Sequence, residues 1–297
     1  MRFILYAIHL NGKINMRQVV RYTAYPVIAG GTLLLMLTLA AKGIHFLQFS
    51  SILLLAAISL VAIMERINPY EQKWNQDHAN DTKVDAVHLV VGYILTQTSV
   101  GIGFGLQALL GHTWGIWPQT WPLWLQVLLA GVVLDLGLYL MHRASHASSA
   151  LWRLHAIHHS AERLYWLNGG RRHPVSALVL AGPSLILLML LGVNPLALGI
   201  WMSFMTIHLA FQHANLDYTL GVFSKWLGIA EMHRWHHKRE FEDAQVNFGE
   251  VFLLWDHLFG TFHHAKTGPR SGEVGLRHET INNSYWQQLK WPFSRIR

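Results

Sequence analysis

Six long apolar segments limit the folds that this chain of 297 residues can adopt. They cover residues 25–41, 46–64, 84–110, 121–141, 175–191 and 195–212. A helix of about 20 apolar residues spans the hydrocarbon core of a bilayer, which is roughly 30 Å thick. Only 13% of the residues are charged, whereas 52% are hydrophobic. The sequence therefore predicts an all-α, polytopic membrane helical bundle with four to six membrane segments.

The last two apolar segments are slightly short for full crossings. Gly192 and Pro195 lie at the junction between them and favour a tight break in the chain. The pair can therefore form either two complete spans or a shallow hairpin that enters the membrane from one side.

The distribution of positive charge predicts the orientation. Residues 142–173 carry five Arg, and the chain after residue 225 is also basic, whereas residues 111–120 carry neither Lys nor Arg. Because cytoplasmic loops are enriched in Lys and Arg, six crossings with an inside N-terminus place both termini in the cytoplasm. These loops also account for the net charge of +7, so we predict no nucleic-acid partner. Residues 1–21 lack a small-residue cleavage site and are interpreted as a cytoplasmic lead-in, not a removed signal peptide.

Four tryptophans lie in and beside the 111–120 linker. They suit either an aromatic belt at the outer membrane interface or ordinary core packing. These residues are Trp114, Trp117, Trp121 and Trp124.

Three short histidine clusters carry the candidate chemistry. One has the pattern H-x3-H and two have the pattern H-x2-H-H. The eight residues are His142, His146, His155, His158, His159, His233, His236 and His237. On a helix, positions i, i+3 and i+4 share one face, so we expect each cluster to direct its imidazoles at one point. Eight imidazoles exceed the needs of one tetrahedral metal but suffice for two metals with open positions, about 3.5–6 Å apart.

An acidic residue precedes the first cluster on the same helix face. Asp135, Tyr139, His142 and His146 are spaced 4, 3 and 4 residues apart. An acid inside an apolar helix is costly and usually functional. Asp135 is expected either to orient a ligating imidazole through its second nitrogen or to make a hydrogen bond between helices. Tyr139 is as compatible with the core as with the surroundings of the metals.

The ordered series of motifs between residues 135 and 261 resembles the fatty acid hydroxylase/sterol desaturase superfamily of membrane di-metal oxygenases. The matching residues are Asp135, Tyr139, His142, Arg143 and His146; His155, His158 and His159; Asn168, Arg171, Arg172, His173 and Pro174; Gln212, His213, Ala214 and Asn215; His233, His236 and His237; Asn247, Phe248 and Gly249; and Trp255, Asp256, Phe259, Gly260 and Thr261. The resemblance implies O₂-dependent hydroxylation or desaturation of a lipid at a di-iron centre.

The resemblance adds two metal ligands, His173 and His213, to the eight above. His208 lies five residues before His213, about 140° away on a helix, so both cannot face one metal. We interpret His208 either as a residue that orients a metal ligand or as a packed, hydrogen-bonded residue, and leave open whether it contacts a metal. Asp217 is a candidate residue for binding a metal-bound water or for anchoring a ligand. His263 and His264 can bind adventitious metal but are assigned no catalytic role.

Three parts of the chain follow from these motifs. Residues 1–120 form N-terminal membrane segments, and residues 121–265 form a di-metal catalytic domain resembling fatty acid hydroxylases, with its helical histidine-rich cap in the cytoplasm. Residues 266–297 form a cytoplasmic tail. The expected cofactor is a pair of Fe ions, with Zn as a substitute on purification that cannot perform redox chemistry.

The chain has no cysteine, so disulfides and thiolate metal sites are excluded. No glycine-rich dinucleotide motif or fused haem domain is recognisable. Electrons should therefore come from a separate reductase, cytochrome or ferredoxin, and the lipid substrate should come from the membrane.

The alternatives are a lipid desaturase on the same scaffold, a hydrolytic zinc enzyme, and a non-enzymatic metal or haem membrane protein. The last is disfavoured because transporters place ligands near mid-bilayer and haem needs pairs of histidines.

Overall fold

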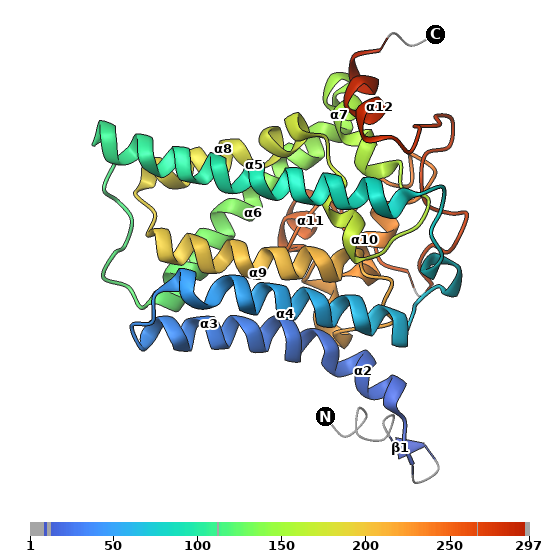
Figure 1. Ribbon diagram of the computed structural model, residues 1–297, viewed down its shortest axis with the longest axis horizontal. Helices are drawn as coiled ribbons and strands as arrows, with labels where there is room; N and C mark the ends of the chain where they lie inside the picture. Colours follow the sequence, from blue (N-terminus) through green and yellow to red (C-terminus); the bar gives the residue numbers. More distant parts are fainter. Residues whose placement is uncertain (1–8, 11–12, 112, 266, 295–297) are drawn as a thin grey trace.

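Six long helices lie side by side, and shorter helices cover one end of the bundle (Figure 1). The computed structural model describes residues 9–10, 13–111, 113–265 and 267–294. Of the expected cytoplasmic lead-in and tail, residues 1–8, 11–12, 266 and 295–297 lie outside the described residues. The described part contains one pair of two-residue strands, β1 (His9–Leu10) and β2 (Lys13–Ile14). The predicted all-α membrane bundle is confirmed.

All six long helices have the length and composition needed to cross a membrane. The first span consists of α2 (Met16–Tyr25), a π-helical turn η1 (Pro26–Gly30) and α3 (Gly31–Ala41). The others are α4 (Phe46–Ile67), α5 (Asp81–Leu110), α6 (Leu123–Ala147), α8 (Pro174–Leu191) and α9 (Pro195–His213). Helices α8 and α9 are about 27 and 28 Å long, which favours two complete spans over a shallow hairpin.

The first span begins at Met16, earlier than the apolar pattern indicated. The side chain of Asn15 caps this helix by accepting hydrogen bonds from the backbone N–H groups of Arg17 and Gln18, at 3.1 and 3.4 Å. Arg17 and Arg21 make the first turns polar, so a search for apolar residues places the start too late. Residues 16–21 of the expected lead-in are therefore helical.

Three short connections between the spans lie at one end of the bundle. Most of the shorter helices form a cap at the other end (Figure 1). Residues 42–45, 111 with 113–122, and 192–194 connect the spans at the end away from the cap. The cap contains η2 (Gln72–Asn75), α7 (Ser149–His159), η3 (Trp166–Gly170), η4 (Gly221–Lys225), α10 (Ala230–His236), α12 (Tyr285–Lys290) and η5 (Trp291–Phe293). Helix α11 (Leu254–Phe259) instead lies beside the middle part of α6 (Figure 1). The segments that bear the three histidine clusters therefore meet at the cap end.

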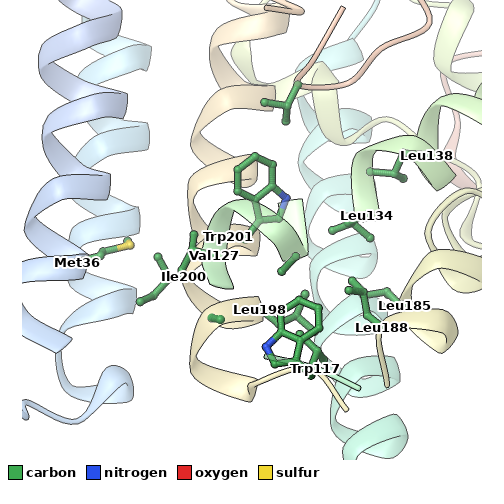
Figure 2. Close-up of a cluster of buried hydrophobic side chains, with 14 of the residues drawn as sticks. Met36, Trp117, Val127, Leu134, Leu138, Leu185, Leu188, Leu198, Ile200 and Trp201 are labelled. Atoms are coloured by element: carbon green, nitrogen blue, oxygen red, sulfur yellow. The ribbon is translucent and has the colours of Figure 1, made fainter. Parts of the chain in front are cut away.

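The bundle core lies where α6, α8 and α9 meet. Figure 2 shows Trp201 of α9 beside Leu134 of α6, with Leu188 of α8 nearby. A Cβ atom on Gly131 would lie 2.5 Å from the Trp201 ring, so only glycine permits this approach of α6 to α9. Trp117 also belongs to the core and donates its indole N–H to Gln126 at 2.9 Å.

The remaining three tryptophans of the linker region are solvent-exposed in the isolated chain. Trp114, Trp121 and Trp124 are 59%, 48% and 56% exposed. These positions match the predicted interfacial belt, whereas Trp117 follows the core alternative. Large apolar side chains are also exposed along α4 and α5, for example Ile52 and Ile102, as expected for helices that face lipid.

Candidate metal centre

Nine buried histidines form two adjoining groups at the cap end. Group A contains His142, His146, His155, His159 and His236, and group B contains His158, His213, His233 and His237. Within each group the candidate ligand atoms lie within 4.8 Å of one another. Each of the nine residues is at most 5% exposed. The structure thus brings together nine of the ten histidines that the sequence predicts as ligands.

The two H-x2-H-H segments do not each point at one metal position, contrary to the expectation from helical spacing. In α7, His155 and His159 face group A while His158 faces group B. On a helix, positions i and i+4 lie about 40° apart, whereas position i+3 lies about 60° from one and 100° from the other. The first and last histidines therefore pair, and the middle one serves the neighbouring group.

The same division holds in and just after α10. His233 and His237 face group B, and His236 crosses to group A. The rings of His159 and His237 stack where the groups meet, with centroids 4.5 Å apart. The two groups therefore share a boundary made of imidazoles.

The separations between ring nitrogens fit bound metal ions. The Nε2 atoms of His142 and His155 are 3.0 Å apart, and those of His213 and His233 are also 3.0 Å apart. Two metal–nitrogen bonds of about 2.1 Å at right angles put the nitrogens roughly 3.0 Å apart. The Nε2 atom of His158 is buried without a hydrogen-bond partner among the described residues. A metal ion in each group would satisfy these otherwise unpaired acceptors.

Backbone carbonyls of the 246–249 loop orient two ligands. His142 donates its Nδ1–H to the carbonyl of Phe248, and His236 donates its own to that of Val246, both at 2.9 Å. A proton on Nδ1 leaves Nε2 free to bind metal, so the loop selects the tautomer of each ring.

Asp256 holds this loop in place. Its carboxylate accepts hydrogen bonds from the backbone N–H groups of Phe248 and Gly249, at 2.8 and 2.9 Å, and from the hydroxyl of Thr261 at 2.6 Å. A Cβ atom on Gly249 would lie 2.3 Å from the carbonyl oxygen of Phe252, so this position requires glycine. These residues belong to the motifs that resemble the superfamily, but the motifs alone predict no role for them.

Two other ligands are oriented from the segment around η3. His158 donates its Nδ1–H to the carbonyl of Arg171 at 3.2 Å. His213 donates its Nδ1–H to the side-chain oxygen of Asn168 at 3.0 Å. This segment therefore orients imidazoles of group B, as the 246–249 loop orients imidazoles of group A.

Burial keeps the imidazoles neutral. It lowers the pKa well below the ordinary value of about 6.5 for the six candidate ligands of the two H-x2-H-H segments, and neighbouring histidines lower it further. These residues are His155, His158, His159, His233, His236 and His237. Neutral imidazole is the form that binds metal, so the groups are ready to bind at neutral pH.

Asp135 does not orient an imidazole. It accepts hydrogen bonds from the backbone N–H groups of Val251 and Phe252, at 2.7 and 3.1 Å, and from the indole of Trp255 at 3.0 Å. Of the two expected roles, the structure shows the packing one, because the acid ties α6 to the segment before α11. Tyr139 lies in the same region and shares a hydrogen bond with Thr261.

His173 lies outside both groups, so its ligation stays a prediction. It caps α8: its Nδ1 accepts from the backbone N–H of Val175, and its Nε2 donates to the carbonyl of Leu289, each at 3.2 Å. Both nitrogens are thus engaged elsewhere.

Four further residues whose roles the sequence left open or minor also lie outside the two groups. His208 is hydrogen-bonded to Tyr25 and to the carbonyl of Glu250, as its interpretation as a packed residue requires. Asp217 lies beyond the end of α9 and forms an ion pair with Arg21 at 3.7 Å. His263 and His264 belong to neither group.

Two adjoining cavities lead from the side of the bundle toward the histidines. The outer one, of about 600 Å³, lies between α4, α5 and α9 and reaches the surface at Leu47 and Tyr93. The inner one, of about 170 Å³, lies between α5, α6, α8 and α9 and is lined by Arg172 and Glu250. Their shared lining residues are Tyr93, Thr96, Met202 and Thr206. We refer to both cavities together as the lateral channel.

The lateral channel ends beside group A. A carboxylate oxygen of Glu250 lies 3.9 Å from Nδ1 of His142. Most of the inner lining is apolar, with Arg172 and Glu250 as its charged residues, so the channel suits a ligand with a long apolar part.

Comparison with known proteins agrees with this geometry. The fatty acid hydroxylase family model matches residues 127–261. The ornithine lipid hydroxylase OlsE of Rhizobium tropici is 34% identical over 260 residues, which cover 84% of this chain and 77% of that protein. An alkylglycerol monooxygenase of Danio rerio is 28% identical over 71% of this chain and 49% of its own length. Methylsterol monooxygenase 1 of Danio rerio is 26% identical over 50% of this chain and 51% of its own length. No solved structure matches.

The bundle and its two imidazole groups define a multi-pass membrane protein with a histidine-rich candidate metal centre. Its sequence relationships extend over most of the chain. The chain belongs to the fatty acid hydroxylase family and is an oxidoreductase of the lipid hydroxylase/desaturase type. The superfamily resemblance is thereby confirmed.

Proposed function

We propose that this protein hydroxylates a C–H bond of a membrane lipid, using O₂, two iron ions and electrons from a separate donor. The observation that carries the proposal is the lateral channel, which runs from the lipid-facing side of the bundle to Glu250, a residue 3.9 Å from His142 of group A. One oxygen atom enters the lipid and the other leaves as water. The reaction therefore consumes two electrons and two protons.

The donor set supports iron. Group A would hold one ion through five imidazoles and group B the other through four, which leaves open positions in group B. Bound iron supplies the change of oxidation state that O₂ activation requires, whereas zinc cannot change its oxidation state. The chain's own part is to orient the imidazoles, exclude water by burial and admit the lipid from the side.

A pocket on the cap supports delivery of electrons by a separate protein. It has a volume of about 200 Å³ and is lined by Trp152, His159 and Lys238, among others. The Trp152 ring lies 4.9 Å from that of His146 and 5.2 Å from that of His159. His159 thus lines the pocket itself, and His146 is separated from it by one aromatic ring. The basic cap segments favour the cytoplasmic side, where soluble donors are present.

Ornithine lipid is the first substrate to test. The ornithine lipid hydroxylase is similar along 84% of this chain, a larger share than the alkylglycerol and methylsterol monooxygenases named above. Such a lipid keeps its acyl chains in the bilayer while part of the molecule enters the lateral channel.

The test uses purified, iron-loaded protein in lipid nanodiscs that contain ornithine lipid, with ferredoxin and its reductase as donor. Under ¹⁸O₂ the lipid should gain one labelled oxygen, and omission of either O₂ or the donor should abolish the product. Loss of two hydrogens without label would show desaturation instead. A product formed without O₂ would overturn the oxygenase proposal and favour hydrolytic chemistry.

A further inference from the structure

We propose that Arg172 and Glu250 form the site that binds the polar group of the lipid, and that this site selects a zwitterionic group. Arg172 would bind its anionic end and Glu250 its cationic end. The inference rests on the proposed function in that the ligand is taken to be the lipid substrate.

The two residues form a buried ion pair at the inner end of the lateral channel. The Nη2 group of Arg172 donates to both carboxylate oxygens of Glu250, at 3.0 and 3.2 Å. The side chain of Glu250 is fully buried and that of Arg172 is 15% exposed. Buried ion pairs add little stability on balance, because desolvation offsets their attraction. A charged pair in a largely apolar channel therefore indicates a binding role.

The pair keeps spare hydrogen-bonding capacity. Within the described part of the chain, the guanidinium of Arg172 donates only to Glu250, and the carboxylate of Glu250 accepts only from Arg172. A guanidinium has five N–H groups and a carboxylate accepts about four hydrogen bonds. Most of this capacity is left for a ligand, since both residues line the inner cavity.

Arg163, another buried arginine of the cap, shows the contrasting structural case. Its Nε donates to Asp81 at 2.7 Å, its Nη1 to the carbonyl of Trp74 at 2.9 Å, and its Nη2 to Thr82 at 2.8 Å. All three nitrogens of Arg163 are thus used by the protein itself. In Arg172 only one nitrogen is used.

The charges of the pair define the ligand. Together they are neutral, so a purely anionic group bound to Arg172 would meet the repulsion of Glu250. A purely cationic group would meet Arg172 in the same way. A group with one charge of each sign pairs with both residues. An ornithine headgroup that is acylated on one amine keeps a carboxylate and an ammonium, and so fits this chemistry.

The position of the pair also constrains which carbon approaches the metals. Glu250 lies 3.9 Å from His142 of group A, whereas the channel runs from the pair back to the lipid-facing side. A lipid anchored by its polar group therefore presents carbons near that group to the metal centre.

The test is a competition for binding, which needs no turnover. Protein in nanodiscs is offered ornithine lipid, phosphatidic acid and diacylglycerol with matched chain lengths, and bound lipid is measured by native mass spectrometry. The wild type should prefer ornithine lipid to diacylglycerol by about tenfold or more, as expected for charge-assisted hydrogen bonds. Equal binding of all three lipids by the wild type would overturn the proposal.

Removing both charges together avoids leaving one charge buried alone. The double variant Arg172→Met with Glu250→Leu should bind the three lipids about equally while keeping its metal content, because replacement of a buried pair by apolar residues is often tolerated. Glu250→Gln should shift the preference from ornithine lipid toward phosphatidic acid. Arg163→Lys is the matched control and should leave the preference unchanged. An unchanged preference in the double variant would contradict the assignment.

Failure of this inference is distinguishable from failure of the proposed function. A wild type that selects ornithine lipid but oxidises no lipid leaves the binding site intact and overturns the function. A wild type that oxidises ornithine lipid, with a double variant of unaltered preference, overturns the binding site alone.

Discussion

His158 and His236 hold the same position in two H-x2-H-H segments, and each belongs to the metal group that the other segment's paired histidines build. Group A therefore depends on His236 from α10, and group B depends on His158 from α7. Each group draws on three helical segments, so neither one can form within a single segment. The two candidate metal positions are coupled through α7 and α10.

This exchange predicts the effect of removing a middle histidine. His158→Ala or His236→Ala should reduce lipid oxidation by at least about 100-fold, because loss of a ligand should cost no less than loss of a residue that merely orients one. Iron content should fall as well, while the protein still inserts into membranes through its apolar spans. Iron analysis and product assays check this, with His263→Ala as the nearly silent control. Near-normal oxidation by both variants would refute the assignment.

Asp256→Ala should weaken the metal centre from a distance. The change leaves the backbone N–H groups of Phe248 and Gly249 without their acceptor, and so loosens the carbonyl that orients His142. Each unpaired buried group costs about 1–3 kcal/mol, and loss of an orienting residue costs about 10–100-fold in metal affinity. Metal titration and thermal unfolding measure the two effects. His257→Ala, at the neighbouring exposed position, should change neither, and equal metal affinity in both variants would argue against this role.

The metal-free protein should lose stability as the pH falls below about 6.5. The histidines of the two H-x2-H-H segments have lowered pKa values when folded, so between the folded and unfolded values the unfolded chain binds more protons. Protonation then favours unfolding, and stability is retained only above this window. Thermal melting in detergent at pH 7.5, 6.5 and 5.5 should give successively lower midpoints. A midpoint that rises toward pH 5.5 would contradict the argument.

The two ends of the bundle should face opposite compartments. The cap and the 113–120 linker lie at opposite ends of the long helices (Figure 1). The Lys and Arg distribution predicts that the cap end is cytoplasmic. Reporter fusions after residue 297 and within residues 113–120 should therefore report opposite sides, with the former inside. The same sidedness for both fusions would exclude the six-crossing arrangement.

The spans could be predicted from the sequence because apolar composition and length are local properties. The start of the first span at Met16 could not be predicted in this way. The helix begins there because Asn15 caps it, and its first turns contain two arginines, so they lack the apolar content that marks a span. The pattern also predicted the segments whose histidines the structure brings together. It did not reveal their division into two groups, because helical spacing gives angles on one helix and not the positions of its neighbours.

The residues that orient the ligands were harder to predict for a different reason. The carbonyls of Val246 and Phe248 belong to the backbone, which carries no side-chain signature. His173 lies outside both groups and caps α8, a role that H-P before an apolar run also permits. A carboxylate that follows a loop by a few residues, as Asp256 does, is a signal that could have been used.

The sharing of ligands between α7 and α10 also sets the order in which the centre can be completed during synthesis. When the chain has been made as far as His213, group A has four of its five imidazoles but group B has only His158 and His213. Group B gains its other two ligands, and group A its last, within the five residues 233–237. Both groups are thus finished at nearly the same moment, after all six spans have been made, so any metal would be loaded late in the biogenesis of this protein.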